Sequence, residues 1–184
     1  MTRYSACAPG NFAIVATHSF LQDYIQTLGV NFMEKKVSLR NTQITFSIWD
    51  LGGQKEFISM LPLVCNESAV MLFLFDLTRP ATLASVKEWY RQVRTHNKTA
   101  IPFLVGTHFD AFAQQPPDAQ VLPRALIRPL QRCLPHAASQ AETVKTARKY
   151  AAAMKAPLVF TSASLGVNIQ KLFKVRAPHP ESPL

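Results

Sequence analysis

Apolar and polar residues alternate near the start of this chain and then give way to continuous apolar runs. Residues 32–40 and 43–49 alternate on either side of an Asn-Thr turn, which predicts an antiparallel pair of strands. Residues 69–75, 101–106 and 157–161 are short apolar runs, which are typical of strands covered on both faces.

Segments with helical character separate these strands. Residues 54–66 indicate an irregular loop and a short helix, and residues 81–95 place apolar side chains at helical spacing. Residues 141–154 are rich in strong helix formers, and residues 166–175 begin a last helix. Strands that alternate with helices predict an α/β fold: a three-layer arrangement around a mostly parallel sheet.

The composition is that of an ordinary globular domain. The chain has 184 residues, of which 48% are apolar and 17% charged, so one domain with a proper core is expected. No window predicts a transmembrane span, and the first residues make a poor signal peptide, so we expect a cytoplasmic protein. The three cysteines are far apart, which argues against disulfides or a zinc site.

The net charge of +9 raises the question of a nucleic-acid or membrane partner. The basic residues are scattered, and no run of five or six like charges exists. The sequence also ends without a prenylation cysteine. We therefore expect no nucleic-acid partner, no lipidation motif and no membrane anchor.

Polar residues of particular kinds follow three of the predicted strands. They form the stretches Asp50–Gln54, Thr107–Asp110 and Ser162–Ser164. In open α/β sheets, ligands bind beyond the carboxyl ends of the strands. Taken in this order, the three stretches match the nucleotide site of a small GTPase.

Each residue type suits a step of nucleotide chemistry. Asp50 can hold Mg²⁺ at the phosphates, and Thr27, in a loop before the first predicted strand, can offer its hydroxyl to the same ion. Gly53 lets a backbone N–H approach the γ-phosphate, and Gln54 can orient the attacking water. The carboxylate of Asp110 can accept two N–H bonds from guanine, which adenine does not offer.

Over about seventy percent of its length, the chain resembles the fungal septation-initiation GTPases of the Ras superfamily, which are Rab-like. The stretches that carry the resemblance include "DYIQTLGVNFMEKKVSLRNTQITFSIWDLGGQKEF", "IPFLVGTHFD" and "PLVFTSASLGVNIQKLF". By this resemblance Thr27 is the switch I threonine, and Asp50, Gly53 and Gln54 form the switch II motif. The remaining nucleotide-binding residues that it implies contact the base: Thr107, His108, Asp110, Ser162 and Ala163.

The resemblance implies a function and partners. The chain is expected to bind GTP and GDP with Mg²⁺, and to hydrolyse GTP with Gln54 as the catalytic residue. It would act as a molecular switch in the septation initiation and mitotic exit pathway that controls cytokinesis. The implied partners are a protein kinase effector and a two-component GAP, with the spindle pole body as a site of action.

The sequence departs from the family in three places. No glycine pair has the G-x-x-x-x-G-K spacing of a P-loop, so the domain is expected to lack its central strand and to be truncated at the N-terminus unless residues 11–16 fill the gap. His108 and Ser164 stand where the family has lysines. We expect an atypical segment 1–18, a GTPase-like domain over 19–175 with an atypical insert at about 121–139, and an atypical tail 176–184.

Simpler interpretations stay open. Asp50 alone could cap a helix, Gln54 is by default a loop residue, and His108 is more often a solvated histidine than a ligand. Asp76, which follows a buried strand, is expected to cap the next helix or turn. The alternative function is a non-catalytic GTPase remnant that acts as an interaction protein, because nucleotide binding is lost with the P-loop.

Overall fold

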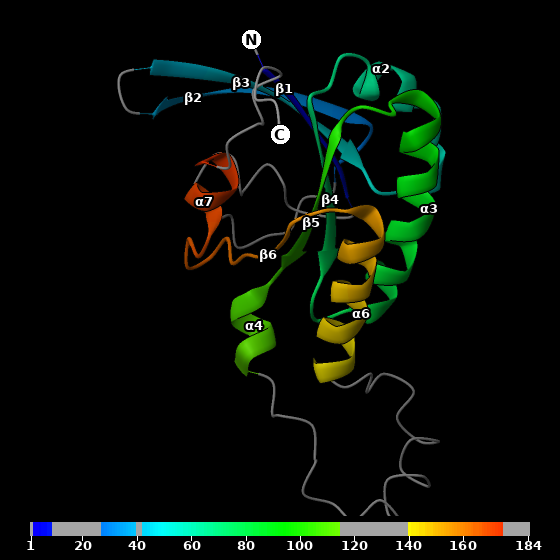
Figure 1. The fold of residues 1–184 in the computed structure, drawn as a ribbon, viewed down its shortest axis with the longest axis vertical. Coiled ribbons are helices and arrows are strands. Elements are labelled where there is room, and N and C mark those ends of the chain that lie inside the picture. Colours follow the sequence, from blue (N-terminus) through cyan, green and yellow to red (C-terminus); the bar gives the residue numbers. More distant parts are fainter. Residues whose placement is uncertain (1, 9–26, 40–41, 115–139, 175–184) are drawn as a thin grey trace, which may run out of the picture.

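The computed structural model describes residues 2–8, 27–39, 42–114 and 140–174 (Figure 1). The strands are β1 (Thr2–Ala8), β2 (Val30–Leu39), β3 (Thr42–Gly52), β4 (Val70–Asp76), β5 (Ile101–Thr107) and β6 (Leu158–Phe160). The helices are η1 (Lys55–Met60), α2 (Leu61–Cys65), α3 (Pro80–His96), α4 (Phe109–Gln114), α6 (Gln140–Met154) and α7 (Ile169–Lys174).

The strands form one six-stranded sheet in the order β2-β3-β1-β4-β5-β6. Among the described strands, only β2 and β3 pair antiparallel, with Val37 opposite Ile44, and every other neighbouring pair is parallel. The strand order is non-consecutive, so the parallel connections must cross the faces of the sheet, where the helices lie.

Helices cover both faces of the sheet. Along β4, Met71, Phe73 and Phe75 point to one face and pack in a core with α2, α3 and α6. The residues between them, Leu72 and Leu74, point to the other face and pack against α7. Figure 1 shows α3 and α6 on one side of the sheet and α7 on the other. The predicted three-layer α/β arrangement is confirmed.

The expectation of a missing central strand is wrong. β1, built from Thr2–Ala8, lies between β3 and β4 and pairs with both in parallel. Ala6 is opposite Asp50 on one side and Leu72 on the other. The segment 11–16, named as the candidate to fill the gap, lies outside the described residues. Sequence reasoning overlooked "TRYSACA" because it lacks the apolar run that marks buried strands.

The other predicted elements are found close to their expected positions. The three apolar runs are β4, β5 and β6, and the antiparallel pair is β2 with β3. The proposed insert at about 121–139 and the tail 176–184 lie outside the described residues. Among the residues that the structure describes, no helix has the length and apolar character that a membrane crossing requires.

The central position of β1 can be tested by amide hydrogen exchange. The N–H groups of Tyr4–Cys7 should exchange about as slowly as those of Leu72–Phe75, because hydrogen-bond ladders flank β1 on both sides. Ala6→Pro, which removes one N–H from the middle of the sheet, should lower the free energy of unfolding by about 2–4 kcal/mol. Amides in β1 that exchange like those of an unstructured peptide, while β4 stays protected, would contradict this placement.

Candidate functional site

The carboxyl ends of the parallel strands meet at one edge of the sheet. β3 ends after Asp50 and Leu51 at Gly52, β4 ends at Asp76, and β5 ends at Thr107. β3 and β5 are three strand spacings apart, which is about 14 Å at roughly 4.8 Å per strand. The predicted Mg²⁺ residues and the predicted base-contacting residues therefore share one edge, on either side of β1 and β4.

Thr27 and Asp50 form the first cluster at this edge. The Thr27 hydroxyl donates a hydrogen bond to Asp50 Oδ2 over 3.1 Å, across 23 residues of sequence. The segment that carries Thr27 is held against β3 by the N–H of Gly52, which donates to the carbonyl of Gly29 over 2.9 Å. The structure thus brings together the two side chains that sequence reasoning assigned to Mg²⁺.

Asp50 is a buried carboxylate whose negative charge is stabilised by few neighbouring groups. Its exposed fraction is 3%, and Thr27 is its one side-chain hydrogen-bond partner among the described residues. Burial raises the pKa of Asp50 to about 6, and the Thr27 hydrogen bond lowers it only in part. A divalent cation held beside the carboxylate would offset this burial, so the pair of oxygen ligands fits Mg²⁺.

Gly52 permits the close contact between the two segments. A Cβ at this position would lie too close to the carbonyl oxygen of Thr27 and 2.8 Å from the ring of Phe57. Only a residue without a side chain lets β3 pass beneath the Thr27 segment. Sequence reasoning assigned a role to Gly53 and missed Gly52. The signal that could have found it is the pair of adjacent glycines after a buried strand.

Asp110 and the serines after β6 form the second cluster. Ser164 Oγ donates to Asp110 Oδ2 over 2.8 Å, and the hydroxyls of Ser162 and Ser164 lie 2.9 Å apart. The backbone joins the same segments, because the N–H of Phe109 donates to the carbonyl of Thr161 over 3.0 Å. The predicted base-contacting residues Asp110 and Ser162 therefore lie side by side, with Ser164 between them.

Hydrogen bonds from two serines favour the ionised form of Asp110. Its slight burial would raise the pKa, but hydrogen bonds from Ser162 and Ser164 outweigh this effect and lower the pKa of Asp110. An ionised carboxylate at neutral pH only accepts hydrogen bonds, as guanine recognition requires. Ser164 stands where the family has a lysine, and its hydroxyl supports Asp110 by a hydrogen bond.

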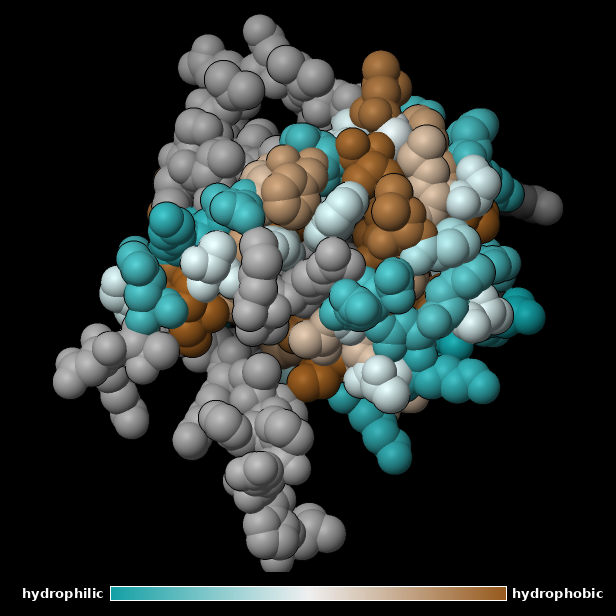
Figure 2. All heavy atoms as spheres, turned by 90° about the horizontal axis from the view of Figure 1, so that it is seen from above, coloured by the Kyte–Doolittle hydropathy of each residue, from teal (hydrophilic) through white to brown (hydrophobic). Residues whose placement is uncertain are grey.

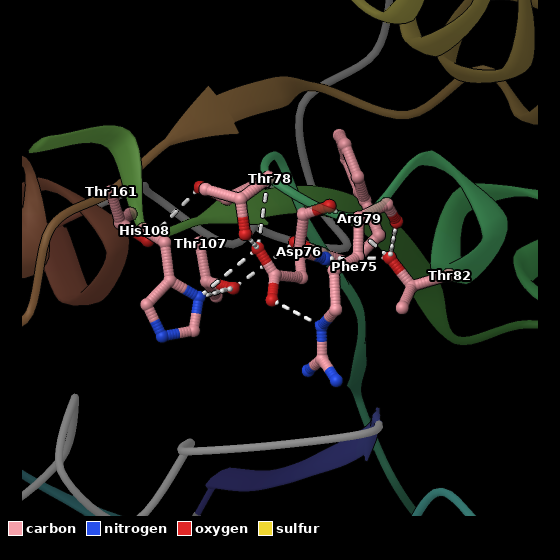
Figure 3. A network of polar contacts seen from close by, with 9 residues as sticks. Phe75, Asp76, Thr78, Arg79, Thr82, Thr107, His108 and Thr161 are labelled. Carbon is pink, nitrogen blue, oxygen red and sulfur yellow. Dashed lines mark hydrogen bonds and ion pairs between the residues drawn. The ribbon is translucent and has the colours of Figure 1, made fainter. Parts of the chain in front are cut away.

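A third cluster surrounds Asp76 between the other two (Figure 3). Asp76 Oδ1 accepts from the backbone N–H of Thr78 over 2.9 Å and from the Thr78 hydroxyl over 2.6 Å. Its Oδ2 accepts from Arg79 Nε over 2.7 Å, and His108 Nδ1 lies 3.3 Å from Oδ1. Of the two predicted roles, helix cap or turn cap, the Thr78 bond confirms the turn cap, because the residue before α3 is Arg79. The two basic partners were not predicted.

The electrostatics of Asp76 are opposite to those of Asp50. Burial alone would raise the pKa of Asp76, but hydrogen bonds from His108, Thr78 and Arg79 hold it well below its usual range. In return, the hydrogen bond to Asp76 raises the pKa of His108, and its partial burial only reduces that rise. His108 is thus the partner of a buried carboxylate. The His108 side chain is 41% exposed, so the expected solvated loop histidine is correct for the part of the ring that does not face Asp76.

The remaining predicted residues occupy varied surroundings. Thr107 is buried and its hydroxyl donates to the carbonyl of Phe75 over 3.1 Å, so it braces β4 against β5. Gln54 is half-buried and precedes η1 with an extended backbone. Gly53 is also half-buried, and Ala163 packs against the core beneath α7. Among the described residues, no group of three or more His, Cys, Asp or Glu side chains is arranged to hold a metal.

Sequence comparison identifies the family to which this site belongs. Residues 12–179 match a family model described as Ras family. The chain belongs to the Ras family. Its fold is therefore the small-GTPase fold, whose members in general bind guanine nucleotides with Mg²⁺.

Three relatives show where the chain stands in that family. It is 50% identical over 169 residues to septum-promoting GTP-binding protein 1 of Schizosaccharomyces pombe, covering 90% of this chain and 75% of the relative. It is 27% identical over 161 residues to human Ras-related protein Rab-31, covering 84% of this chain and 70% of that protein. It is 28% identical over 156 residues to human Ras-related protein Rab-22A, covering 84% of this chain and 68% of that protein.

The residues matched to the family model do not include the central strand of the sheet. The match begins at residue 12, whereas the central strand of the sheet is formed by Thr2–Ala8. A segment outside the matched range thus occupies the middle of a sheet whose other strands lie inside that range. The backbone pairing of β1 with β3 and β4 does not depend on family-like side chains.

Gly52→Ala should destabilise the Thr27 segment. The added methyl group would overlap the Thr27 carbonyl and the Phe57 ring, so we expect the free energy of unfolding to fall by about 1–3 kcal/mol. Urea denaturation measures this loss. Amide exchange at Gly29 and Val30 should become faster in the same variant. A midpoint equal to that of the wild type would show that the close approach is absent in solution.

The cluster around Asp76 should make stability depend on pH at both ends of the scale. The folded pKa of Asp76 lies below its ordinary 3.8, so its contribution is present above about pH 4 and is lost as pH falls. The folded pKa of His108 lies above its ordinary 6.5, so its contribution is present below about pH 6.5 and is lost as pH rises through the folded value.

Two variants separate these contributions in thermal unfolding measured from pH 2 to about pH 9. Asp76→Asn should flatten both pH limbs relative to the wild type. His108→Asn should flatten mainly the alkaline limb, and asparagine tolerates the positive φ of 56° at this position. Parallel pH profiles for the wild type and both variants would contradict the pairing.

Proposed function

We propose that this chain is a guanine-nucleotide-dependent switch that acts in septation. One observation carries the proposal: the Thr27–Asp50 pair and the Asp110–Ser162–Ser164 cluster lie at the same edge of one parallel sheet. The Thr27–Asp50 pair is suited to hold a cation beside phosphates. The Asp110–Ser162–Ser164 cluster is suited to accept hydrogen bonds from the N–H groups of guanine. A single nucleotide would join the two.

The roles of the residues follow from their chemistry. Thr27 and Asp50 would hold Mg²⁺, which when bound neutralises phosphate charge. Gly53 would offer a backbone N–H to the γ-phosphate, and Gln54, at the start of η1, would orient water. Asp110 would accept hydrogen bonds from guanine, and the hydrogen bonds from the two serines favour its ionised form.

The biological setting comes from the relatives. A protein whose name describes it as septum-promoting and GTP-binding shares half of the aligned residues with this chain. The septation initiation pathway is therefore the proposed context, with a protein kinase effector and a two-component GAP as partners. A cytoplasmic location and the spindle pole body are the corresponding proposed sites of action.

The sequence also limits the strength of this site. It contains no G-x-x-x-x-G-K stretch, so the backbone cradle and the lysine of a P-loop are not supplied by a recognisable motif. Charge-assisted hydrogen bonds to phosphate are stronger than neutral hydrogen bonds. Their loss therefore lowers the affinity for nucleotide. Hydrolysis by this chain alone would be slow and would depend on charge supplied by a GAP.

A second candidate function is that of a non-catalytic interaction protein. Four large apolar side chains are exposed around the segments that would sense the nucleotide: Leu28, Phe32, Met60 and Leu63. Phe32 lies against the half-buried Trp49, with ring centroids 5.0 Å apart. Figure 2 shows apolar side chains gathered on the end of the molecule that carries α2. Such a surface can bind a partner whether or not nucleotide is present.

Titration with fluorescent GDP in the presence of Mg²⁺ tests the proposal. We expect saturable binding that unlabelled GTP displaces and ATP does not, because Asp110 accepts only from guanine. Asp110→Ala should weaken binding by about tenfold or more, since it removes charge-assisted hydrogen bonds to the base. Ser164→Ala should weaken it less, because Ser162 remains.

Glu67→Gln is a control at the opposite end of the sheet, because it neutralises an exposed acid that lies just before the start of β4. It should leave GDP binding unchanged. Submicromolar binding that depends on Asp110 would support the switch. Absence of binding in a folded protein would favour the interaction protein, and equal displacement by ATP would contradict the assignment of Asp110.

A further inference from the structure

An apolar groove lies between α4 and α6, away from the site described above. Its volume is about 760 Å³, which is within the range of ligand and peptide sites. The floor is formed by apolar side chains, of which Phe112 is buried and Val144 half-buried. The apolar lining residues are Phe112, Ala141, Val144 and Ala152.

The rim of the groove is basic. Lys145, Arg148 and Lys149 line it and are exposed, and all three come from one face of α6. Arg148 lies four residues from both Val144 and Ala152, on the same side of α6, and Lys145 and Lys149 lie beside that line. Lys145 pairs with Glu142 over 3.7 Å, whereas neither Arg148 nor Lys149 forms an ion pair within the described part of the chain.

The charge of the rim argues against two occupants from this protein itself. By sequence, residues 115–139 carry Arg124, Arg128 and Arg132 and a single acid, Asp118, so like charges would oppose their docking. In a symmetric dimer across this face, the basic rims of two α6 helices would meet. The net charge of +9 adds to that repulsion.

We propose that the α4–α6 groove binds an acidic amphipathic helix of a partner protein. The apolar side of such a helix fills the groove over Phe112 and Val144. Its acidic side chains flank that apolar side and meet Arg148 and Lys149 at the rim. A lipid surface is a poorer match, because the large apolar side chains are buried (Phe112) or half-buried (Val144), and the exposed apolar lining consists of small alanines.

The probe for this groove is a fluorescein-labelled peptide of roughly 16 residues, long enough to form a helix. It carries leucines at positions i, i+3, i+4, i+7 and i+11, with glutamates on both sides of that stripe. Fluorescence anisotropy with the full chain should show saturable binding. A scrambled peptide of the same composition should bind at least about tenfold more weakly, because it has no continuous apolar stripe.

Neighbouring residues of α6 supply a matched pair of variants. Ala152 lines the groove, whereas the next residue, Ala153, is also exposed and does not. Ala152→Glu should weaken peptide binding by about tenfold, since it adds a like charge and bulk in the groove. Ala153→Glu should leave binding within about twofold of the wild type, because any effect there is long-range and screened by salt.

A second pair of variants tests the basic residues of the rim without adding bulk inside the groove. R148E/K149E should weaken binding by about tenfold or more, and the loss should shrink in high salt. K87E/K171E changes the net charge equally on exposed positions of α3 and α7 and should have little effect. Circular dichroism and thermal unfolding confirm that each variant is folded.

Several outcomes would overturn the proposal. Equal binding of the scrambled peptide would show attraction by net charge alone. No peptide binding by the folded wild-type chain would show that the groove has another occupant or none. Loss of co-sedimentation with phosphatidylserine vesicles in R148E/K149E, without peptide binding, would identify a lipid-facing surface instead.

Discussion

The parallel pairing of β1 with β3 and β4 is the interaction on which the rest of this structure depends. It fixes Ala6 beside both Asp50 and Leu72, so the strands on either side end at a common edge. Without β1, the neighbours β3 and β4 would each have an unpaired edge in the middle of a buried sheet, which is costly for backbone polar groups. The two halves of the candidate site would also lose their fixed separation. This strand is formed by residues that lie before the range matched to the Ras family.

Two buried carboxylates at this edge differ in how their charge is compensated. Asp76 has Arg79, His108 and two donors from Thr78 around it, and these hold its pKa low. Asp50 has the Thr27 hydroxyl, and burial raises its pKa to about 6. The first carboxylate is therefore a structural anchor that needs no ligand. The second is less stable as an anion than a solvated carboxylate, and an added positive charge would offset that cost, as expected of a cation ligand.

Sequence reasoning predicted the elements with strong periodicity and the pairing of distant polar residues. The apolar runs of β4, β5 and β6 and the polar strand ends at Asp50, Asp110 and Ser162 carry clear signals. The sequence could not reveal β1, because a strand held by backbone bonds on both sides need not be strongly apolar. It also could not reveal the His108–Asp76 pair, since side-chain direction in a turn with positive φ depends on tertiary contacts. Ser164 was missed because it was compared with a lysine and not assessed as a hydrogen-bond donor.

The most direct test of the shared edge is a ¹⁵N NMR titration with GDP and Mg²⁺. If one nucleotide joins the two clusters, the amide signals of Leu51–Gly53 and those of Asp110 and Ser162–Ser164 should shift together. Both sets should follow a single binding curve with the same midpoint. Shifts confined to one cluster, or two curves with different midpoints, would contradict a common guanine-nucleotide site at this edge of the sheet.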